Sequence, residues 1–231
     1  MRIPDPHSFM QLTKARIAIA LVILLTFAVT LLAWPSMPDP VASHWGFSGE
    51  ADGYLPKAWG LLLVPFLSLG FAALLLLVPR IDPLEANIAQ FREAYEGFIV
   101  VFLLFLLAVQ AFILLWNAGI QVTISLVLSP AFAALFYEIG VLMGQAKPNW
   151  SIGIRTRWTL SSETVWKKTH ALGGKLFRAA GIAALLGILF PGYALLFILV
   201  PVLVVSLYLV VYSYREYREE MAASPGTGVR T

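Results

Sequence analysis

The chain has 231 residues, of which 59% are hydrophobic and 13% are charged, and its formal net charge is +3. Soluble domains carry about a quarter charged residues, so this composition excludes a water-soluble globular protein and indicates an integral membrane protein. The chain contains no cysteine, which excludes disulfide bonds and thiolate metal sites.

Six apolar stretches are candidates for membrane-spanning helices, because a spanning helix needs roughly 20 residues. The stretches cover residues 17–34, 59–78, 98–116, 121–143, 179–190 and 193–212. We therefore predict an all-α integral membrane protein, a six-transmembrane helix bundle with short amphipathic cytoplasmic helices and a structured outer loop. No small-residue cleavage site follows the first stretch, so we expect an uncleaved span rather than a signal peptide.

The fifth stretch is short, so we expect its helix to begin near Gly174, with Lys175 and Arg178 reaching towards the lipid headgroups. A single helix through the last two stretches would be about 50 Å long, which is too long for the bilayer core. Pro191-Gly192 is therefore interpreted as a tight turn between two spans.

Lysine and arginine residues alternate regularly between the segments that join the spans. The tail at 1–16 has three, the loop at 35–58 one, the connection at 79–97 two, the segment at 145–178 seven and the C-terminal tail three. The positive-inside rule then places both termini and the 145–178 segment in the cytoplasm, and the 35–58 loop outside.

These assignments divide the chain into regions in order. They are a cytoplasmic tail at 1–16, two spans at 17–78 around the outer loop 35–58, a cytoplasmic amphipathic connection at 79–97, spans three and four at 98–143, a cytoplasmic segment at 144–178, a helical hairpin at 179–213, and a cytoplasmic tail at 214–231. We expect the small polar residues at 224–231 to be disordered.

The outer loop is rich in glycine and proline, which predicts an ordered structure of turns rather than a flexible tether. Its polar residues Asp39, His44, Glu50 and Asp52 either solvate a lid on the bundle or cluster around a divalent cation. Their spacing matches no known metal template, so no metal is predicted.

The 145–178 segment carries most of the polar residues that a partner would recognise. Pro148 ends the preceding helix, and Ser161 is the expected N-cap of a short amphipathic helix from 162 to about 172, with Gly173 at its C-cap. Three interpretations stay open: a cationic helix lying along anionic lipid headgroups, a surface that docks a partner protein, or a catalytic centre. The last lacks a nucleophile, base and orienting group, and direct nucleic-acid binding is not expected.

Glu138 is the acid that falls inside a predicted span, about 10 Å from the end of its helix. We expect it to pair with Arg178, Lys175 or Arg155, and a role in a proton or ion path is the alternative. The 79–97 connection predicts a turn and an amphipathic helix beside the 145–178 segment, with Tyr95 facing the bilayer or the bundle.

Three motifs resemble the SdpI family of bacterial immunity proteins, which act against a secreted sporulation-delaying peptide toxin. The motifs are Pro38-Asp-Pro-Val…His44-Trp…Gly49-Glu-Ala-Asp-Gly53, then Ile81-Asp-Pro…Asn87…Phe91…Tyr95, then Lys147-Pro-Asn-Trp…Gly153-Ile-Arg-Thr…Trp158-Thr-Leu-Ser…Glu163…Val165-Trp…Thr169-His…Gly173-Gly174. The first looks like the family's N-terminal domain of unknown function. Arg157 and Val141 depart from the family pattern, where proline and asparagine are usual.

The resemblance implies a multi-pass protein of the prokaryotic plasma membrane that is not an enzyme and needs no cofactor. It would give resistance to a membrane-active peptide and hold a soluble cytoplasmic repressor at the membrane. The docking residues would be Asn149, Arg155, Thr156, Trp158, Glu163, Trp166 and His170, and the outer contacts with toxin or ligand would be Asp39, His44, Trp45, Glu50 and Asp52.

Two other classes of function stay open. A small transporter or channel would use Glu138 in its path. A membrane-embedded hydrolase would use His170 or His44 as its base.

Overall fold

A computed structural model describes residues 6–46, 49–120 and 122–223, with side chains described from residue 14 onwards. The expected tail at 224–231 lies outside these ranges. Within them, six helical segments are long and apolar enough to cross a membrane, which confirms the predicted all-α membrane fold. The segments are Lys14–Ser36, Lys57–Ile81, Glu85–Asn117, Ile124–Gln145, Glu163–Leu189 and Pro191–Ala223.

The elements follow one another in a simple order. They are α1 (Pro6–Ala33), η1 (Trp34–Ser36), β1 (Val41–Trp45), β2 (Ala51–Leu55), α2 (Lys57–Ile81), α3 (Glu85–Ile88), η2 (Ala89–Phe91), α4 (Arg92–Asn117), α5 (Ile124–Gln145), α6 (Arg157–Ser161), α7 (Glu163–Ala184), α8 (Leu186–Leu189), η3 (Pro191–Tyr193) and α9 (Ala194–Ala223).

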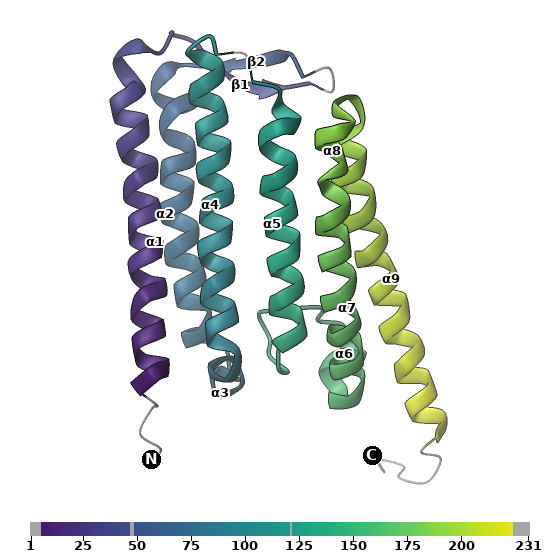
Figure 1. Ribbon diagram of the computed structural model, residues 1–231. Helices are drawn as coiled ribbons and strands as arrows, with labels where there is room; N and C mark the ends of the chain where they lie inside the picture. The colour runs from purple at the N-terminus through teal and green to yellow at the C-terminus, as the bar shows by residue number, and fades with distance from the viewer. Residues whose placement is uncertain (1–5, 47–48, 121, 224–231) are drawn as a thin grey trace.

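The long helices stand side by side in two groups of three (Figure 1). The first group is α1, α2 and α4, and the second is α5, α7 and α9, with α4 packing against α5 between them. The strands β1 and β2 lie across one end, here called the hairpin end. The start of α1, the end of α9, and the short helices α3 and α6 lie at the opposite end (Figure 1). That end also holds residues 146–162, here called the connector, so we name it the connector end.

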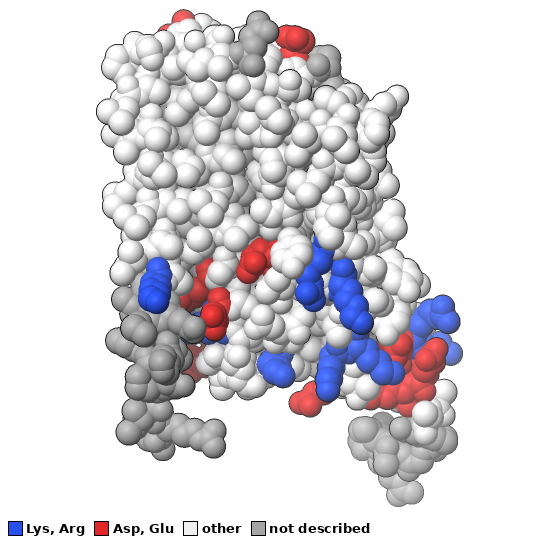
Figure 2. Space-filling model, in the orientation of Figure 1, with Lys and Arg blue, Asp and Glu red and all other residues white. Residues whose placement is uncertain are grey.

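Charged side chains are concentrated at the connector end. On the face shown in Figure 2, Lys, Arg, Asp and Glu gather there, and the long middle part of the bundle carries almost none. A wide uncharged belt is the surface expected of a protein whose middle is surrounded by hydrocarbon.

The outer loop is ordered as an antiparallel hairpin of β1 and β2, in which Val41 pairs with Leu55. The Asn117 side chain, at the end of α4, accepts a hydrogen bond from Ala42 N at 2.8 Å and donates one to Ala42 O at 3.0 Å. Val41 is fully buried against Gly60 of α2. The hairpin is therefore fixed to two helices of the first group.

Proline residues interrupt α2 at two places, and side chains of α4 compensate for both. Proline cannot donate a backbone hydrogen bond to the carbonyl four residues earlier. Pro65 leaves the Leu61 carbonyl without its helical donor, and Gln110 Nε2 donates to that oxygen at 3.1 Å. Pro79 does the same to Leu75, whose carbonyl accepts from the Tyr95 hydroxyl at 2.7 Å. Both breaks are thus satisfied within the first group.

The helices α5 and α7 approach each other closely through glycine residues. A Cβ added at Gly140 would lie 2.7 Å from Gly174 O, and one added at Gly181 would lie 2.7 Å from Ala133 O. Such small residues let two helix backbones touch, which is the common packing of helices in membranes.

This packing corrects the expectation of a separate cytoplasmic helix that ends at Gly173. Helix α7 continues without a break from Glu163 to Ala184. Gly173 and Gly174 are buried where α7 crosses α5 and α9, so their role is close packing and not termination. The N-cap of α7 is Ser162, because its hydroxyl accepts from Val165 N, whereas the expected cap Ser161 ends α6.

Candidate functional site

The connector begins as a tight loop organised by the side chain of Asn149, which is fully buried. Its Oδ1 accepts hydrogen bonds from Ser151 N at 2.9 Å and Ile152 N at 2.6 Å. Its Nδ2 donates to Lys147 O at 2.8 Å and Ile152 O at 3.1 Å. One amide therefore satisfies four backbone groups, which is the full capacity of an asparagine side chain.

His170 of α7 lies under this loop and is also buried. Its Nδ1 lies 2.9 Å from Trp166 O, and its Nε2 accepts from Ile154 N at 3.1 Å. A carbonyl requires a donor and a backbone N–H requires an acceptor, so these contacts fix the neutral ring with the proton on Nδ1. Gly153, at φ +105°, lies directly on the ring, where a Cβ would come within 2.3 Å of Nε2. His170 is thus a structural residue in this arrangement, with no free nitrogen for base catalysis.

Trp166 lies one turn before His170, and the two rings stack at 3.9 Å. The indole Nε1 donates to Ala146 O at 2.9 Å, which satisfies a free carbonyl at the C-terminal end of α5. Trp166 is 1% exposed, so its ring is not available to a partner.

The next part of the connector is the short helix α6, which Thr156 caps. Thr156 and Thr159 form a reciprocal capping box. Trp158 donates from Nε1 to Ser213 Oγ at 2.6 Å and packs edge-on against Tyr214. The connector is therefore attached to α9 as well as to α7.

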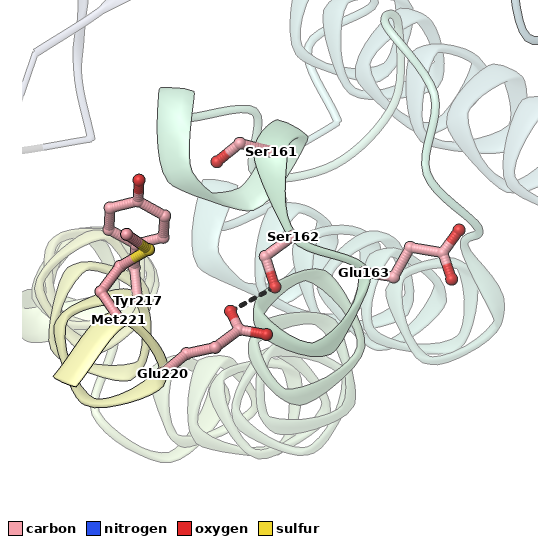
Figure 3. Close-up of a pocket in the computed structure, with 6 residues that line it drawn as sticks. All are labelled: Ser161, Ser162, Glu163, Tyr217, Glu220 and Met221. Carbon is pink, nitrogen blue, oxygen red and sulfur yellow. Dashed lines mark hydrogen bonds between the residues drawn. The ribbon is translucent and has the colours of Figure 1, made fainter. Parts of the chain in front are cut away.

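Two further contacts join the start of α7 to the end of α9. Ser162 Oγ donates to Glu220 Oε2 at 2.5 Å, beside a surface pocket of about 340 Å³ (Figure 3). Lys168 Nζ lies 2.7 Å from Glu216 Oε2. Acidic residues of α9 thus meet the basic face of α7.

Asp82, which directly follows α2, joins the connector to the first group of helices. It is 4% exposed, and its Oδ2 accepts from Trp150 N at 3.0 Å and from Ser151 Oγ at 2.6 Å. Asn87 adds a bond from Nδ2 to Pro148 O at 2.8 Å. Asp82 belongs to the second of the three family-like motifs, and the sequence alone predicts no role for it. Its position just before a proline, at the end of a span, was the available signal.

These contacts divide the predicted docking residues by accessibility. Asn149, Trp166 and His170 are buried, and Thr156 and Trp158 are half-buried. Arg155 and Glu163 are exposed, although Arg155 Nη1 also donates to the Trp150 carbonyl. The exposed connector residues outside the predicted set are Lys147, Trp150, Gly153, Arg157 and Ser161. The buried side chains fix the backbone of the connector, and the exposed side chains form the surface that is available to a partner.

At the hairpin end, the structure brings two of the predicted contact residues, His44 and Asp52, into contact. Asp39 Oδ1 accepts from Lys57 N at 3.0 Å, and His44 Nδ1 lies 2.5 Å from Asp52 Oδ1. Among the described residues, no three His, Asp or Glu side chains gather as metal ligands. The cation-site alternative therefore gains no support from the geometry.

Two other predicted contacts of the outer loop lie beside the α4–α5 turn. Trp45 packs edge-on against Phe112 and Trp116 of α4. Glu50 lines a pocket of about 500 Å³ together with Trp116 and Thr123.

Glu138 is half-buried on α5, and its Oε1 faces Gly97 of α4. The expected pairing with Arg178, Lys175 or Arg155 is wrong: among the described residues no basic side chain forms an ion pair with it. Arg178 packs on Gly140, two residues further along α5. Successive residues are about 100° apart around a helix, so the two positions face nearly opposite sides.

Glu96 is a buried acid for which the sequence alone predicts no role. Its Oε1 lies 3.2 Å from Arg92 Nε and 3.8 Å from Arg16 Nε, which joins α4 to α1. The i, i+4 spacing of Arg92 and Glu96 was the signal for the first of these pairs.

Comparison with known proteins places matches on both groups of helices. Residues 21–69 match a domain of unknown function (DUF1648), and residues 145–213 match the SdpI/YfhL protein family. The chain is 26% identical over 207 residues to Immunity protein SdpI of Bacillus subtilis (strain 168). The aligned region covers 89% of this chain and 97% of that protein. No solved structure matches the chain. The predicted resemblance is thus confirmed: this multi-pass membrane protein is similar to the SdpI family along most of its length.

Proposed function

We propose that this protein is a membrane immunity protein that protects its own cell from a secreted, membrane-active peptide toxin. The observation that supports this most directly is the similarity to an immunity protein over 207 residues, which is 89% of this chain. The relative is named for immunity and not for an enzymatic activity, which agrees with the non-enzymatic role expected from the motifs.

We further propose that the connector end faces the cytoplasm of a prokaryotic cell and docks a repressor there. The connector is held on three sides, by Asp82, by His170 and by Ser213. A surface fixed in this way loses little conformational entropy when a partner binds. Trp150, which is 56% exposed, and Arg155 are of the residue types that dominate binding energy at interfaces.

The toxin would meet the hairpin end, where His44, Glu50 and Asp52 are the candidate contacts. The hairpin packs directly on α2 and α4, so a peptide bound there would contact a rigid surface and not a tether.

A resistance assay tests the immunity role. Cells that lack their own immunity protein are exposed to the sporulation-delaying peptide, with and without this chain in their membranes. Survival should rise by more than about tenfold when the chain is present, and unchanged survival with a correctly inserted protein would contradict the proposal.

A recruitment assay tests the docking role separately. Where a small helix-turn-helix repressor is encoded beside this chain, its tagged form is the partner to be tested, and the measurement is its co-fractionation with membranes. Replacing Trp150 and Arg155 together with alanine should release the repressor, while Arg80→Ala, an exposed arginine at the same end but outside the connector, should not. Equal retention by both variants would exclude the connector as the docking surface.

The transporter alternative has less support. Glu138 is the acid on which it depends, and the described structure places no ionisable partner in contact with it. A proton or ion path needs a series of such groups.

A further inference from the structure

Helix α2 is connected at its two ends to the two regions that the proposed function uses. Strand β2 ends at Leu55, and α2 begins two residues later at Lys57. At its other end α2 stops at Ile81, and the next residue is Asp82, which holds the connector. The helix has 25 residues and is thus about 37 Å long.

The contact between the hairpin and α2 is tight. A Cβ built on Gly60 would lie 2.1 Å from Val41 Cγ2, so the valine rests directly on the helix backbone. Val41 is fully buried, and Lys57 Nζ donates to Met37 O at 2.7 Å just before the hairpin. A movement of the hairpin therefore presses on the first turns of α2.

The contact between α2 and the connector is equally specific. Asp82 Oδ1 accepts from Leu84 N at 2.8 Å, which fixes the carboxylate on the turn after α2. Its Oδ2 accepts two bonds from the connector, from Trp150 N and Ser151 Oγ. One oxygen of this buried carboxylate is thus bonded to the turn after α2 and the other to the connector, which joins the connector to the end of α2.

Between these contacts, α2 contains two positions of the kind at which helices commonly bend. Pro65 and Pro79 interrupt its backbone ladder. The freed carbonyls are held by side chains, Gln110 and Tyr95, and not by the helix itself.

We propose that Asp82 is a positioning residue that couples the hairpin to the connector through α2. Displacement of the hairpin by a ligand then loosens the connector and changes what it presents to a partner. The inference rests on the proposed function for the nature of that ligand, but the coupling is a property of this chain alone and is measurable without it.

The test is a double-mutant cycle on the full-length protein in detergent, with amide hydrogen exchange of the connector as the measurement. Gly60→Ala forces Val41 away from α2. In the native background, exchange at Ser151 and Ile152 should rise about tenfold, a usual size for coupling between sites. In the Asp82→Asn background, Gly60→Ala should add less than about twofold.

Matched controls make the outcome specific. Gly70→Ala is the same substitution on the same helix, and its new methyl group meets nothing within 4 Å, so it should leave connector exchange unchanged. The two reporter amides are bonded to Asn149 and not to Asp82, so Asp82→Asn leaves them protected and able to report a further increase. Ser151→Ala removes one of the two Oδ2 contacts and should weaken the coupling without abolishing it.

If Gly60→Ala prevents folding, Val41→Ala perturbs the same contact from the strand side and should give a smaller rise. Equal increases in the native and Asp82→Asn backgrounds, or no rise in the native background from either variant, would overturn the coupling. Neither result bears on survival in the toxin assay, so failure of the coupling and failure of the immunity role are separate outcomes.

Discussion

Single polar side chains inside the spans of this protein satisfy backbone groups that proline leaves free. Tyr95 and Gln110 of α4 each donate to a carbonyl of α2 that lies four residues before a proline. An unsatisfied carbonyl in hydrocarbon costs several kcal/mol, so these two residues allow α2 to contain its prolines. Polar residues in a span thus need not mark a transport path.

Removing the Tyr95 hydroxyl tests this account. Tyr95→Phe keeps the ring and leaves Leu75 O without a donor, so the free energy of unfolding should fall by about 1–3 kcal/mol. Equilibrium unfolding in mixed detergent micelles measures the change. Tyr137→Phe is the control, because Tyr137 is 47% exposed on α5 and its hydroxyl makes no hydrogen bond within the described structure. A loss of the same size in both variants would show that the Tyr95 bond does not matter.

At the scale of whole elements, the two groups of helices are held together differently. The first group encloses the large apolar core built around α1, α2 and α4. In the second group, α5 and α7 pack by direct backbone contact at Gly140, Gly174 and Gly181. The second group should therefore tolerate added volume poorly at these positions.

Two Gly→Ala substitutions, one in each group of helices, compare how well the two groups tolerate an added methyl group. Gly140→Ala places a methyl group 2.7 Å from Gly174 O and 2.8 Å from Arg178 N, both backbone atoms. The two helices must separate, and stability should fall by about 2 kcal/mol, as for other overpacked cores. Gly70→Ala, with open space around the new methyl group, should be neutral or stabilising. Equal stability of both variants by the same unfolding measurement would contradict the close packing of α5 on α7.

At the scale of the molecule, the two ends differ in charge and in structure. The connector end gathers basic and acidic side chains, and the hairpin end has few on the face shown in Figure 2. The positive-inside rule then predicts that the connector lies in the cytoplasm.

Cysteine labelling tests this orientation, and the chain has no native cysteine to interfere. Tyr54→Cys, on the hairpin, should react with a membrane-impermeant maleimide in intact cells. Lys167→Cys, exposed on α7 near the connector, should react only after the cells are opened. The reverse pattern would place the connector outside and remove the proposal that it docks a cytoplasmic repressor.

The sequence by itself determined the class of protein and the number of spans. Hydropathy is a local property, and each span carries its own signal, as the apolar stretch 59–78 within α2 shows. The sequence also located the segment with the most specific chemistry, because the polar residues after α5 stand out in so apolar a chain.

Only the tertiary structure decided what individual polar residues do. Asn149, Trp166 and His170 have side chains that suit either an exposed surface or a buried hydrogen-bond network, and spacing along the chain does not distinguish the two. Their hydrogen-bond partners are backbone groups of Ile152, Ala146 and Ile154, and the type of a residue does not show which backbone groups will be bonded. A glycine at position 173 is compatible with either a helix end or close helix packing. The contacts of Gly173 with α5 and α9 show that its role is close packing. Contacts between distant segments settle such choices, because burial and pairing are properties of the assembled bundle.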